Sequence, residues 1–317
     1  MSQKFKPIDL SGVHTYTLAD RDSKVSSNDF AKTWRKGSSY RMFLDNLPDI
    51  LAGRQLKDVI SAIVKAYQDK RTVLFGMGAH VIKVGLSPIV IDLMERGIIT
   101  GLAMNGAGII HDVEVAMIGR TSEDVAATLD EGSFGMAQET CTFLGDAIIA
   151  AENDDTGLGA AVGRAIIDKQ LPLMNESILA TGARLGIPVT VHVAFGTDII
   201  HMHPGFDPRK AGAATHRDFR LFAAMVAKLQ KGVYLNVGSA VILPEIFLKA
   251  ITLVRNLGNT LNDFTTVNLD FIKHYRPLTN VVTRPTSRGG RGMNLVGHHE
   301  ILIPLIAAGV IEYLDPS

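Results

Sequence analysis

Four side chains that could bind a metal ion or move a proton fall within one short stretch of the sequence. They are His192, Asp198, His201 and His203. Imidazole and carboxylate groups are common ligands of Zn²⁺, and the His-x-His spacing at 201 and 203 brings two imidazoles near one point. The stretch is therefore compatible with a metal-dependent hydrolase or lyase in which these four residues hold the ion.

The same stretch has a second interpretation. His192 lies in a valine-rich segment, where a histidine is more often a hydrogen-bonded core residue. Asp198 and His201 could then hydrogen-bond a nucleotide or serve as general acid and base, because an imidazole titrates at about pH 6.5. Histidine spacing of this kind is frequent by accident. We therefore expect no metal, with zinc as the alternative.

The run from Arg284 to Gly292 contains three arginines and three glycines. Guanidinium groups bind carboxylates and phosphates through paired hydrogen bonds, and glycines expose backbone N–H groups to the same anion. The run follows an apolar segment that we predict to be a strand, which would place it at the ligand-binding edge of a sheet. We therefore expect Arg288 and Arg291 to bind an anionic small-molecule substrate.

The elements that must position these groups alternate between short apolar runs and helical patterns. The apolar runs, each predicted to be a strand, are 72–75, 98–104, 188–195, 233–237, 264–269 and 280–283. Apolar residues at helical spacing lie between them, and a last helix is expected over 300–314. This alternation predicts an α/β fold with a parallel sheet flanked by helices, whose ligands bind at the carboxyl ends of the strands.

Several of the predicted strands end in glycine-rich or polar turns. These turns include 76–80, 105–108, 196–198 and 238–239. Glycine lets backbone N–H groups approach a ligand, so the succession of turns predicts a ligand-binding rim. None of them matches a dinucleotide fingerprint or a P-loop, so spacing alone does not name the cofactor.

The first seventy residues differ from the rest of the chain. Residues 1–30 are polar and predict an arm, and apolar residues at helical spacing follow as far as Val64. We therefore expect an N-terminal arm and helical extension at 1–70 and one nucleotide-binding domain at 71–317.

The composition excludes several classes of protein. The chain of 317 residues has 32 Lys and Arg against 32 Asp and Glu, so it lacks the basic excess of proteins that bind nucleic acid. Its one cysteine, Cys141, excludes an intrachain disulfide and favours a cytoplasmic location. No uncharged run reaches the ~20 apolar residues of a bilayer span, so we expect no membrane partner.

The order of these motifs resembles the deoxyhypusine synthase family from about Arg71 to Leu314. The run from Met104 to Asp112 is similar to the family's glycine-rich turn followed by acidic residues, and 196–198 is similar to its Thr-Asp-Gly element. The resemblance implies a Rossmann-like sheet that binds NAD, and assembly as a homotetramer. It further implies that the cofactor is lined by Gly78, Asn105, Gly106, Gly108, Asp112, Thr197, Gly238 and Ser239.

The chain departs from this family where the chemistry takes place. Family synthases use a lysine that forms an imine, whereas this sequence has no lysine after Lys273 and carries the arginine run instead. Arginine cannot supply the amine that an imine requires. We therefore expect an enzyme with this scaffold that does not make deoxyhypusine, with His111, Asp198 and His201 as catalytic residues. A non-catalytic NAD sensor is a further alternative.

Overall fold

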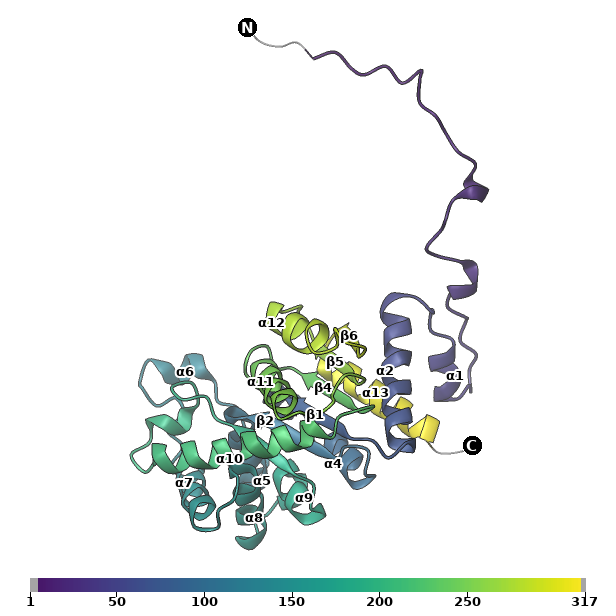
Figure 1. Ribbon diagram of the computed structural model, residues 1–317. Helices are drawn as coiled ribbons and strands as arrows, with labels where there is room; N and C mark the ends of the chain where they lie inside the picture. The colour runs from purple at the N-terminus through teal and green to yellow at the C-terminus, as the bar shows by residue number, and fades with distance from the viewer. Residues whose placement is uncertain (1–4, 315–317) are drawn as a thin grey trace.

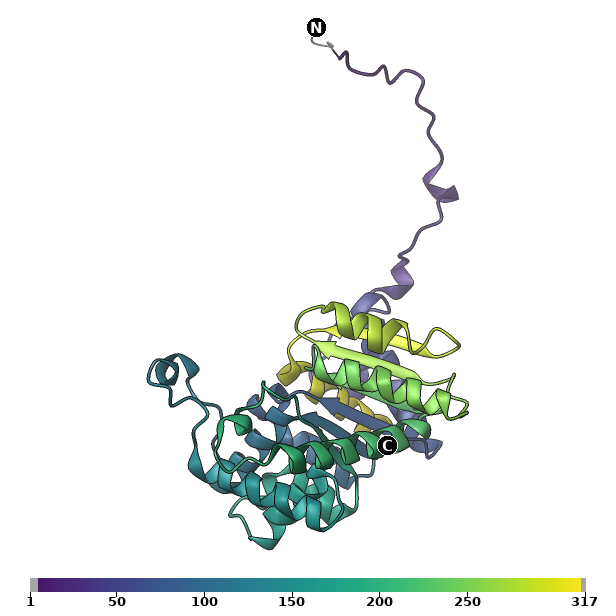
Figure 2. The ribbon, with the colours of Figure 1, turned by 60° about the vertical axis from the view of Figure 1, so that its left-hand side comes forward.

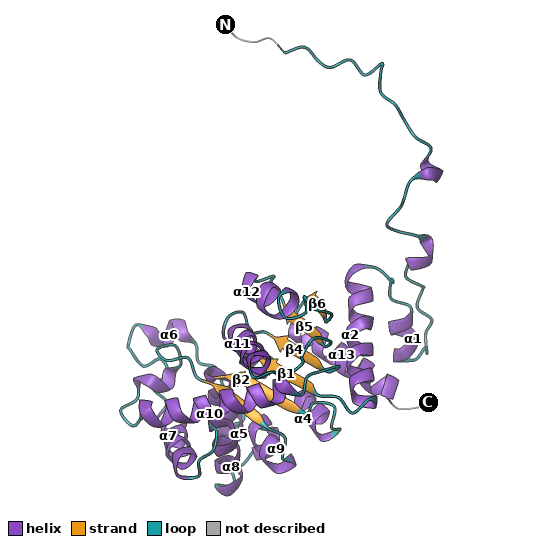
Figure 3. Ribbon diagram, in the orientation of Figure 1, coloured by secondary structure: helices purple, strands orange, loops and turns teal. Residues whose placement is uncertain are grey.

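Parallel strands form one continuous sheet at the centre of the computed structural model, which describes residues 5–314 (Figure 3). The strands are β1 (Val73–Met77), β2 (Gly101–Asn105), β3 (Val189–His192), β4 (Val233–Val237), β5 (Thr265–Asp270) and β6 (Arg291–Val296). Their order is β3-β2-β1-β4-β5-β6, and every neighbouring pair is parallel. The order reverses between β1 and β4, as in doubly wound folds. The expected α/β fold is confirmed.

The central strands are buried on both faces, as parallel strands covered by helices must be. All residues of β1 are buried. Phe75 contributes to one hydrophobic core and Leu74 to the other, and in β4 the same is true of Leu235 and Tyr234. Successive side chains of a strand point to opposite faces, so each face of the sheet has its own core.

Long helices cover both faces of the sheet. The first core includes side chains of α2 (Leu51–Gln68), α4 (Ser87–Glu95) and α13 (His299–Leu314), and the second those of α10 (Pro208–Ala227) and α11 (Ile242–Asn256). Figure 1 shows α2 beside α13, the last described helix. None of the helices within residues 5–314 is long and apolar enough to cross a membrane.

The β3 end of the sheet carries a further helical layer of α5 (Gly106–Ile118), α7 (Gln138–Asn153), α8 (Leu158–Asp168) and α9 (Ile178–Leu185). Helix α10 protects the open edge of β3: the Asp218 carboxylate accepts from the Val191 N–H at 2.9 Å, and the Thr215 hydroxyl from the Val193 N–H at 3.0 Å. The polar backbone of this edge strand is therefore bonded within the chain. Shorter helices are α1 (Tyr40–Asp45), α3 (His80–Lys83), α6 (Val125–Leu129) and α12 (Tyr275–Pro277).

The sixth strand does not lie where the sequence predicts it. Residues Leu278–Thr283 form a short π-helix, η5, and β6 follows later at Arg291–Val296. This helix packs against α11 and β5, and Val281 is fully buried there. Burial of the helix therefore explains why the run contains valines although it is not a strand. A short apolar run does not by itself distinguish a strand from a buried helical turn. The arginine run therefore leads into β6, whose first residues are Arg291 and Gly292, instead of following a strand.

An extended N-terminal arm projects from this body. Figures 1 and 2 show it running away from the helices up to α1, with short 3-10 helices at Leu18–Asp20 and Ser27–Asp29. It joins the body where the Lys32 N–H donates to the Asn46 carbonyl oxygen at 3.0 Å. Helix α2 itself belongs to the main core, since Val59 and Ile60 are fully buried in it.

Candidate functional site

Two glycines meet where the strand order reverses, at the carboxyl ends of β1 and β4. The Gly78 N–H donates to the Val237 carbonyl oxygen at 2.9 Å, and a side chain at 78 would collide with the Gly238 carbonyl oxygen. Gly238 has φ +63°, and a side chain there would press on the His299 ring. Both positions therefore require glycine. Bare backbone at such a switch point is where doubly wound folds bind dinucleotides.

Ring side chains that were not predicted as site residues gather at this end of the sheet. His80 follows β1, and its ring centroid lies 5.4 Å from that of His299 and 6.0 Å from that of Phe271. Asp270, the last residue of β5, is buried and accepts from the Phe271 N–H at 2.9 Å. The position of His80 and Asp270 directly at strand ends was the signal that could have identified them.

His299 is held between these strand ends. Its Nε2 lies 3.2 Å from the Leu269 carbonyl oxygen, and its Nδ1 is buried with no hydrogen-bond partner within residues 5–314. Burial lowers the pKa of His299, which keeps the ring neutral. Nε2–H is then the donor to Leu269, and Nδ1 has a free lone pair.

The predicted residues at the ends of β2 and β3 form a second group. The Asn105 side chain caps α5 by accepting from the Gly108 N–H at 3.1 Å. The Asp198 carboxylate lies against Gly106, where any side chain would collide with it, and accepts from the Ala194 N–H at 2.9 Å. Burial raises the pKa of Asp198. Gly106 is therefore explained by a contact within the protein, and so is Gly108, which packs on the Met104 side chain.

A cavity of about 230 Å³ opens beside this second group. It brings together the predicted residues His111, Thr197 and Asp198, and adds charged side chains from α3 and from the segment before α6. The residues that line it are Lys83, Ala107, Ile110, His111, Glu114, Ser122, Glu123, Val125, Phe134, Thr197, Asp198 and Ile199. Helix α3 follows β1, and its last residue, Lys83, connects the cavity to the segment that leaves the switch point.

His201 does not line this cavity. Its ring stacks on Phe195 at 5.1 Å between centroids and meets the edge of Phe206 at 4.7 Å. Its Nδ1 accepts from the Gly196 N–H at 3.3 Å. The ring thus supports the loop that carries Asp198. Its Nε2 is buried with no hydrogen-bond partner within residues 5–314, and its part in proton transfer stays a prediction.

Asp112 is bonded to the start of α9 inside the protein, whereas the sequence predicted that it binds the cofactor. Its carboxylate is fully buried and accepts from the Ser177 hydroxyl at 2.5 Å and from the N–H groups of Ile178 and Leu179 at 2.9 and 3.2 Å. These are the first residues of α9, whose N-terminus attracts negative charge. Burial nevertheless raises the pKa of Asp112 to about 6.

The residues of the alternative zinc site have separate partners. His192 is buried, with Nε2 3.1 Å from the Thr190 hydroxyl, and burial lowers its pKa to about 3. The Nε2 of His203 lies 2.9 Å from the Gly135 carbonyl oxygen. Across residues 5–314 there is no group of three His, Cys, Asp or Glu side chains that could hold a metal ion. Zinc at the His192 cluster is therefore unsupported.

The predicted anion-binding arginines lie at the opposite edge of the sheet. Because the run precedes β6, it lies with the amino ends of the strands, whereas the glycine turns follow their carboxyl ends. Arg291 forms an ion pair with Asp58 of α2, and Arg288 is exposed. The misplaced sixth strand led to this prediction, and the structure places both arginines near the amino end of β6.

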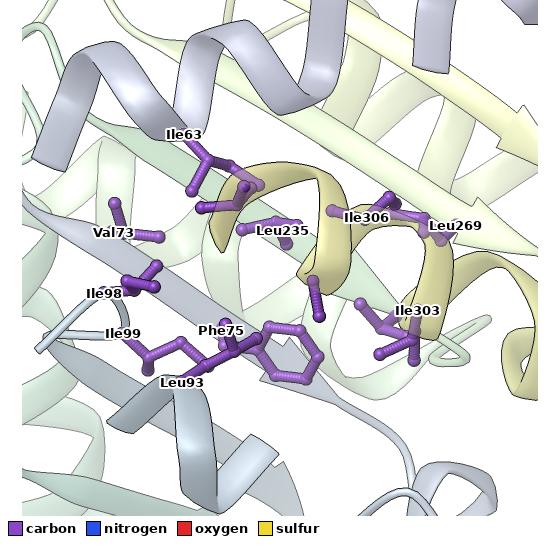
Figure 4. A pocket seen from close by; sticks show the side chains of 13 residues that line it. Ile63, Val73, Phe75, Leu93, Ile98, Ile99, Leu235, Leu269, Ile303 and Ile306 are labelled. Atoms are coloured by element: carbon purple, nitrogen blue, oxygen red, sulfur yellow. The ribbon is translucent and has the colours of Figure 1, made fainter. Parts of the chain in front are cut away.

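A cavity inside the core is too small for a ligand. It measures about 20 Å³, lies among side chains of β1, β4, α2, α4 and α13, and is lined only by apolar residues. Figure 4 shows Phe75, Ile303 and Ile306 around it. A dry void of this size is a packing defect and provides no polar group for recognition.

The strand order defines a doubly wound α/β protein whose order reverses between β1 and β4. The sequence matches no family model and no curated protein. The fold, however, resembles several solved structures.

One of them is AgrE in a ternary complex with ornithine and NAD⁺, with a TM-score of 0.56 and 13% identity over 89% of this chain and 35% of that chain. Another, from Entamoeba histolytica and provisionally named a deoxyhypusine synthase, has a TM-score of 0.52 and 12% identity over 90% of this chain and 97% of that one. A third is ArgZ, an arginine dihydrolase of the cyanobacterial ornithine–ammonia cycle, with a TM-score of 0.50 and 13% identity over 83% of this chain.

These similarities show the fold alone. The chain spans about a third of the length of ArgZ and AgrE, 32% and 35%. The match to the Entamoeba histolytica structure covers nearly all of both chains, so the scaffold expected from the sequence is the one observed.

Proposed function

We propose that this chain is an enzyme with a deoxyhypusine-synthase-like scaffold that binds NAD or a related dinucleotide across the β1/β4 switch point. The observation that carries the proposal is the meeting of Gly78 and Gly238 at the point where the strand order reverses. Backbone without side chains lets a pyrophosphate approach closely there. The similarity to AgrE, whose structure holds NAD⁺ and ornithine, supports the same cofactor class.

The substrate of this enzyme is a small molecule in the adjacent cavity. Three carboxylates line that cavity, from Glu114, Glu123 and Asp198, whereas Lys83 is its one basic side chain other than the His111 imidazole. An excess of carboxylates favours a ligand that carries a cationic group. The anionic substrate that the arginine run suggested has no comparable support at this edge.

Calorimetric titration of the purified protein with NAD tests the proposal. We expect saturable binding by the wild type, weakened at least about tenfold, or about 1.4 kcal/mol, by Gly78→Ala and by His80→Ala. Gly205→Ala is the matched control, because a methyl group at position 205 meets nothing within 4 Å.

Thermal melts show whether each variant is folded, which matters most for Gly78→Ala because it crowds the Gly238 carbonyl. His80→Ala removes a ring without crowding and is the second, independent variant. Absence of NAD binding by the folded wild type, or equal affinity in all four proteins, would contradict the proposal.

A further inference from the structure

A chain of hydrogen bonds ends on His111 in the cavity beside the switch point. Helix α5 places His111 and Glu114 one turn apart, on the same face. The helix ends at Gly119, which has φ +67° and turns the chain so that Thr121 comes back beside both side chains. Thr140 approaches the same carboxylate from α7.

The distances define a relay from carboxylate to imidazole. The Thr121 hydroxyl donates to Glu114 Oε2 at 2.5 Å, and His111 Nδ1 lies 2.6 Å from the Thr121 hydroxyl oxygen. The Thr140 hydroxyl donates to the other oxygen, Oε1, at 3.2 Å. Burial raises the pKa of Glu114, but the nearby His111 ring, whose Nδ1 lies 3.8 Å from Oε2, and the hydrogen bonds from Thr121 and Thr140 outweigh it and hold the pKa below its usual range.

The number of protons in this relay fixes the state of the ring. An ionised carboxylate can only accept, and a hydroxyl has one proton to donate. Thr121 gives its proton to Glu114, so its oxygen can only accept from His111 Nδ1. The Nδ1 atom must therefore carry a proton. The hydrogen bond at one imidazole nitrogen sets the protonation of the other, which leaves Nε2 with a free lone pair in the neutral ring.

We infer that Thr121 and Glu114 are positioning residues that hold His111 with its proton on Nδ1, so that Nε2 is a general base toward the ligand of the cavity. His111 lines the cavity, and its Nε2 has no hydrogen-bond partner among residues 5–314. A proton passes from the ligand to Nε2, and the Glu114 carboxylate, through Thr121, stabilises the positive ring that forms. Only the identification of the cavity as the substrate site rests on the proposed function.

The tautomer of His111 tests the inference without a known substrate. Long-range ¹H–¹⁵N spectra of protein labelled on histidine, recorded at pH 8, distinguish the two neutral forms, and the signal missing from His111→Gln assigns the residue. We expect the Nδ1–H form in the wild type. A predominant Nε2–H form, or a ring protonated on both nitrogens at this pH, would overturn the inference.

The variants separate a positioning role from a structural one. Thr121→Val removes the hydroxyl and should shift the tautomer ratio about fivefold or more toward Nε2–H, the ratio that one ordinary hydrogen bond supports. Thr121→Ser keeps the hydroxyl and should restore the wild-type ratio. Thr140→Val is the matched control, because it removes a hydrogen bond to Glu114 that does not involve His111. An unchanged ratio in Thr121→Val would also overturn the inference.

Diethyl pyrocarbonate, which modifies neutral imidazoles, reports whether Nε2 can be reached from the cavity. His111 should be modified in the wild type, as measured on its peptide by mass spectrometry, and an unreactive His111 would contradict a free Nε2. NAD titrations of the same variants keep the two claims apart. Thr121→Val should bind NAD as the wild type does. If neither the wild type nor any variant bound NAD, the proposed cofactor would be refuted, whereas the result on the His111 tautomer would still hold.

Discussion

The carboxyl group of Asp218, in α10, is buried beside the first residues of α8. Its Oδ2 accepts from the N–H groups of Gly159 and Val191 at 3.0 and 2.9 Å, while Oδ1 is buried against Gly157 with no partner in the described residues. Burial raises the pKa of Asp218 to about 7, against an ordinary value of 3.8. The backbone donors offset only part of the cost of burying the charge.

This residue makes the stability of the protein depend on pH. The folded protein keeps a proton that the unfolded chain loses, so the contribution of Asp218 is present below about pH 4 and is lost as the pH rises to about 7. Asp218→Asn keeps an oxygen for the two N–H groups and does not titrate. The free energy of unfolding of the wild type, relative to this variant, should fall by about 1 to 4 kcal/mol between pH 4 and pH 8.

Denaturant unfolding at a series of pH values measures that difference. Asp130→Asn, at an exposed position, serves as the control and should run parallel to the wild type. If the wild type gained stability relative to Asp218→Asn as the pH rose, the predicted direction of the pH dependence would be wrong.

Sequence reasoning located some site residues and misplaced others for physical reasons. Asp198 and His111 line one cavity near the ends of the strands, where residues that follow apolar runs fall in a parallel sheet, and their catalytic role stays a prediction. Glu114 and Thr121 were missed, since their role depends on the turn at Gly119 that brings them together. Asp112 was misassigned, because a carboxylate that caps a distant helix looks like a ligand-binding one in sequence.

At the scale of elements, η5 occupies the place of the predicted sixth strand, and the arginine run consequently lies at the amino end of β6. Five of the predicted strand positions were right because buried parallel strands are short apolar runs bounded by turns. The sixth was wrong, since Val281 is buried by a helical turn and the true strand, β6, is half polar and starts with Arg291. An edge strand of this composition carries little apolar signal.

The position of this loop predicts a negative result for its arginines. Arg288→Ala and Arg291→Ala should leave the affinity for NAD within about twofold of the wild type, a difference well below 1 kcal/mol. Arg291→Ala should lower the free energy of unfolding by at most about 1 kcal/mol, since it removes a partly exposed ion pair with Asp58. Calorimetry and denaturant unfolding measure the two effects. A tenfold loss of affinity in Arg288→Ala would show that the loop reaches the cofactor after all.

At the scale of the whole molecule, the N-terminal arm carries apolar side chains that the body does not cover. Each is more than half exposed: Phe5, Ile8, Leu10, Val13, Tyr16, Leu18, Val25, Phe30 and Trp34. Apolar surface of this extent on a protruding segment marks a contact with a partner. We propose a second copy of the chain as that partner, in line with the homo-oligomer that the family resemblance implies.

Removal of residues 1–28 tests this assignment. The truncated protein keeps α1, α2 and the contact of Lys32 with Asn46, so its melting temperature should stay within about 2 °C of the wild type, equivalent to about 1 kcal/mol. Its number of protomers per assembly, from the mass by sedimentation equilibrium divided by the mass of one chain, should be lower. A matched full-length variant with Phe5, Ile8 and Leu10 changed to Ser should weaken assembly in the same direction. The same number of protomers per assembly in all three proteins would contradict the assignment.

Hydrogen–deuterium exchange with and without NAD tests the central claim most directly, because it locates the cofactor on the folded wild type. Bound ligand slows exchange where it covers or rigidifies backbone. We predict protection at residues 77–80 and 237–241, on the two sides of the switch point, and none at 284–290. Protection confined to 284–290, or no protection at NAD concentrations that saturate calorimetric binding, would contradict a dinucleotide site between β1 and β4.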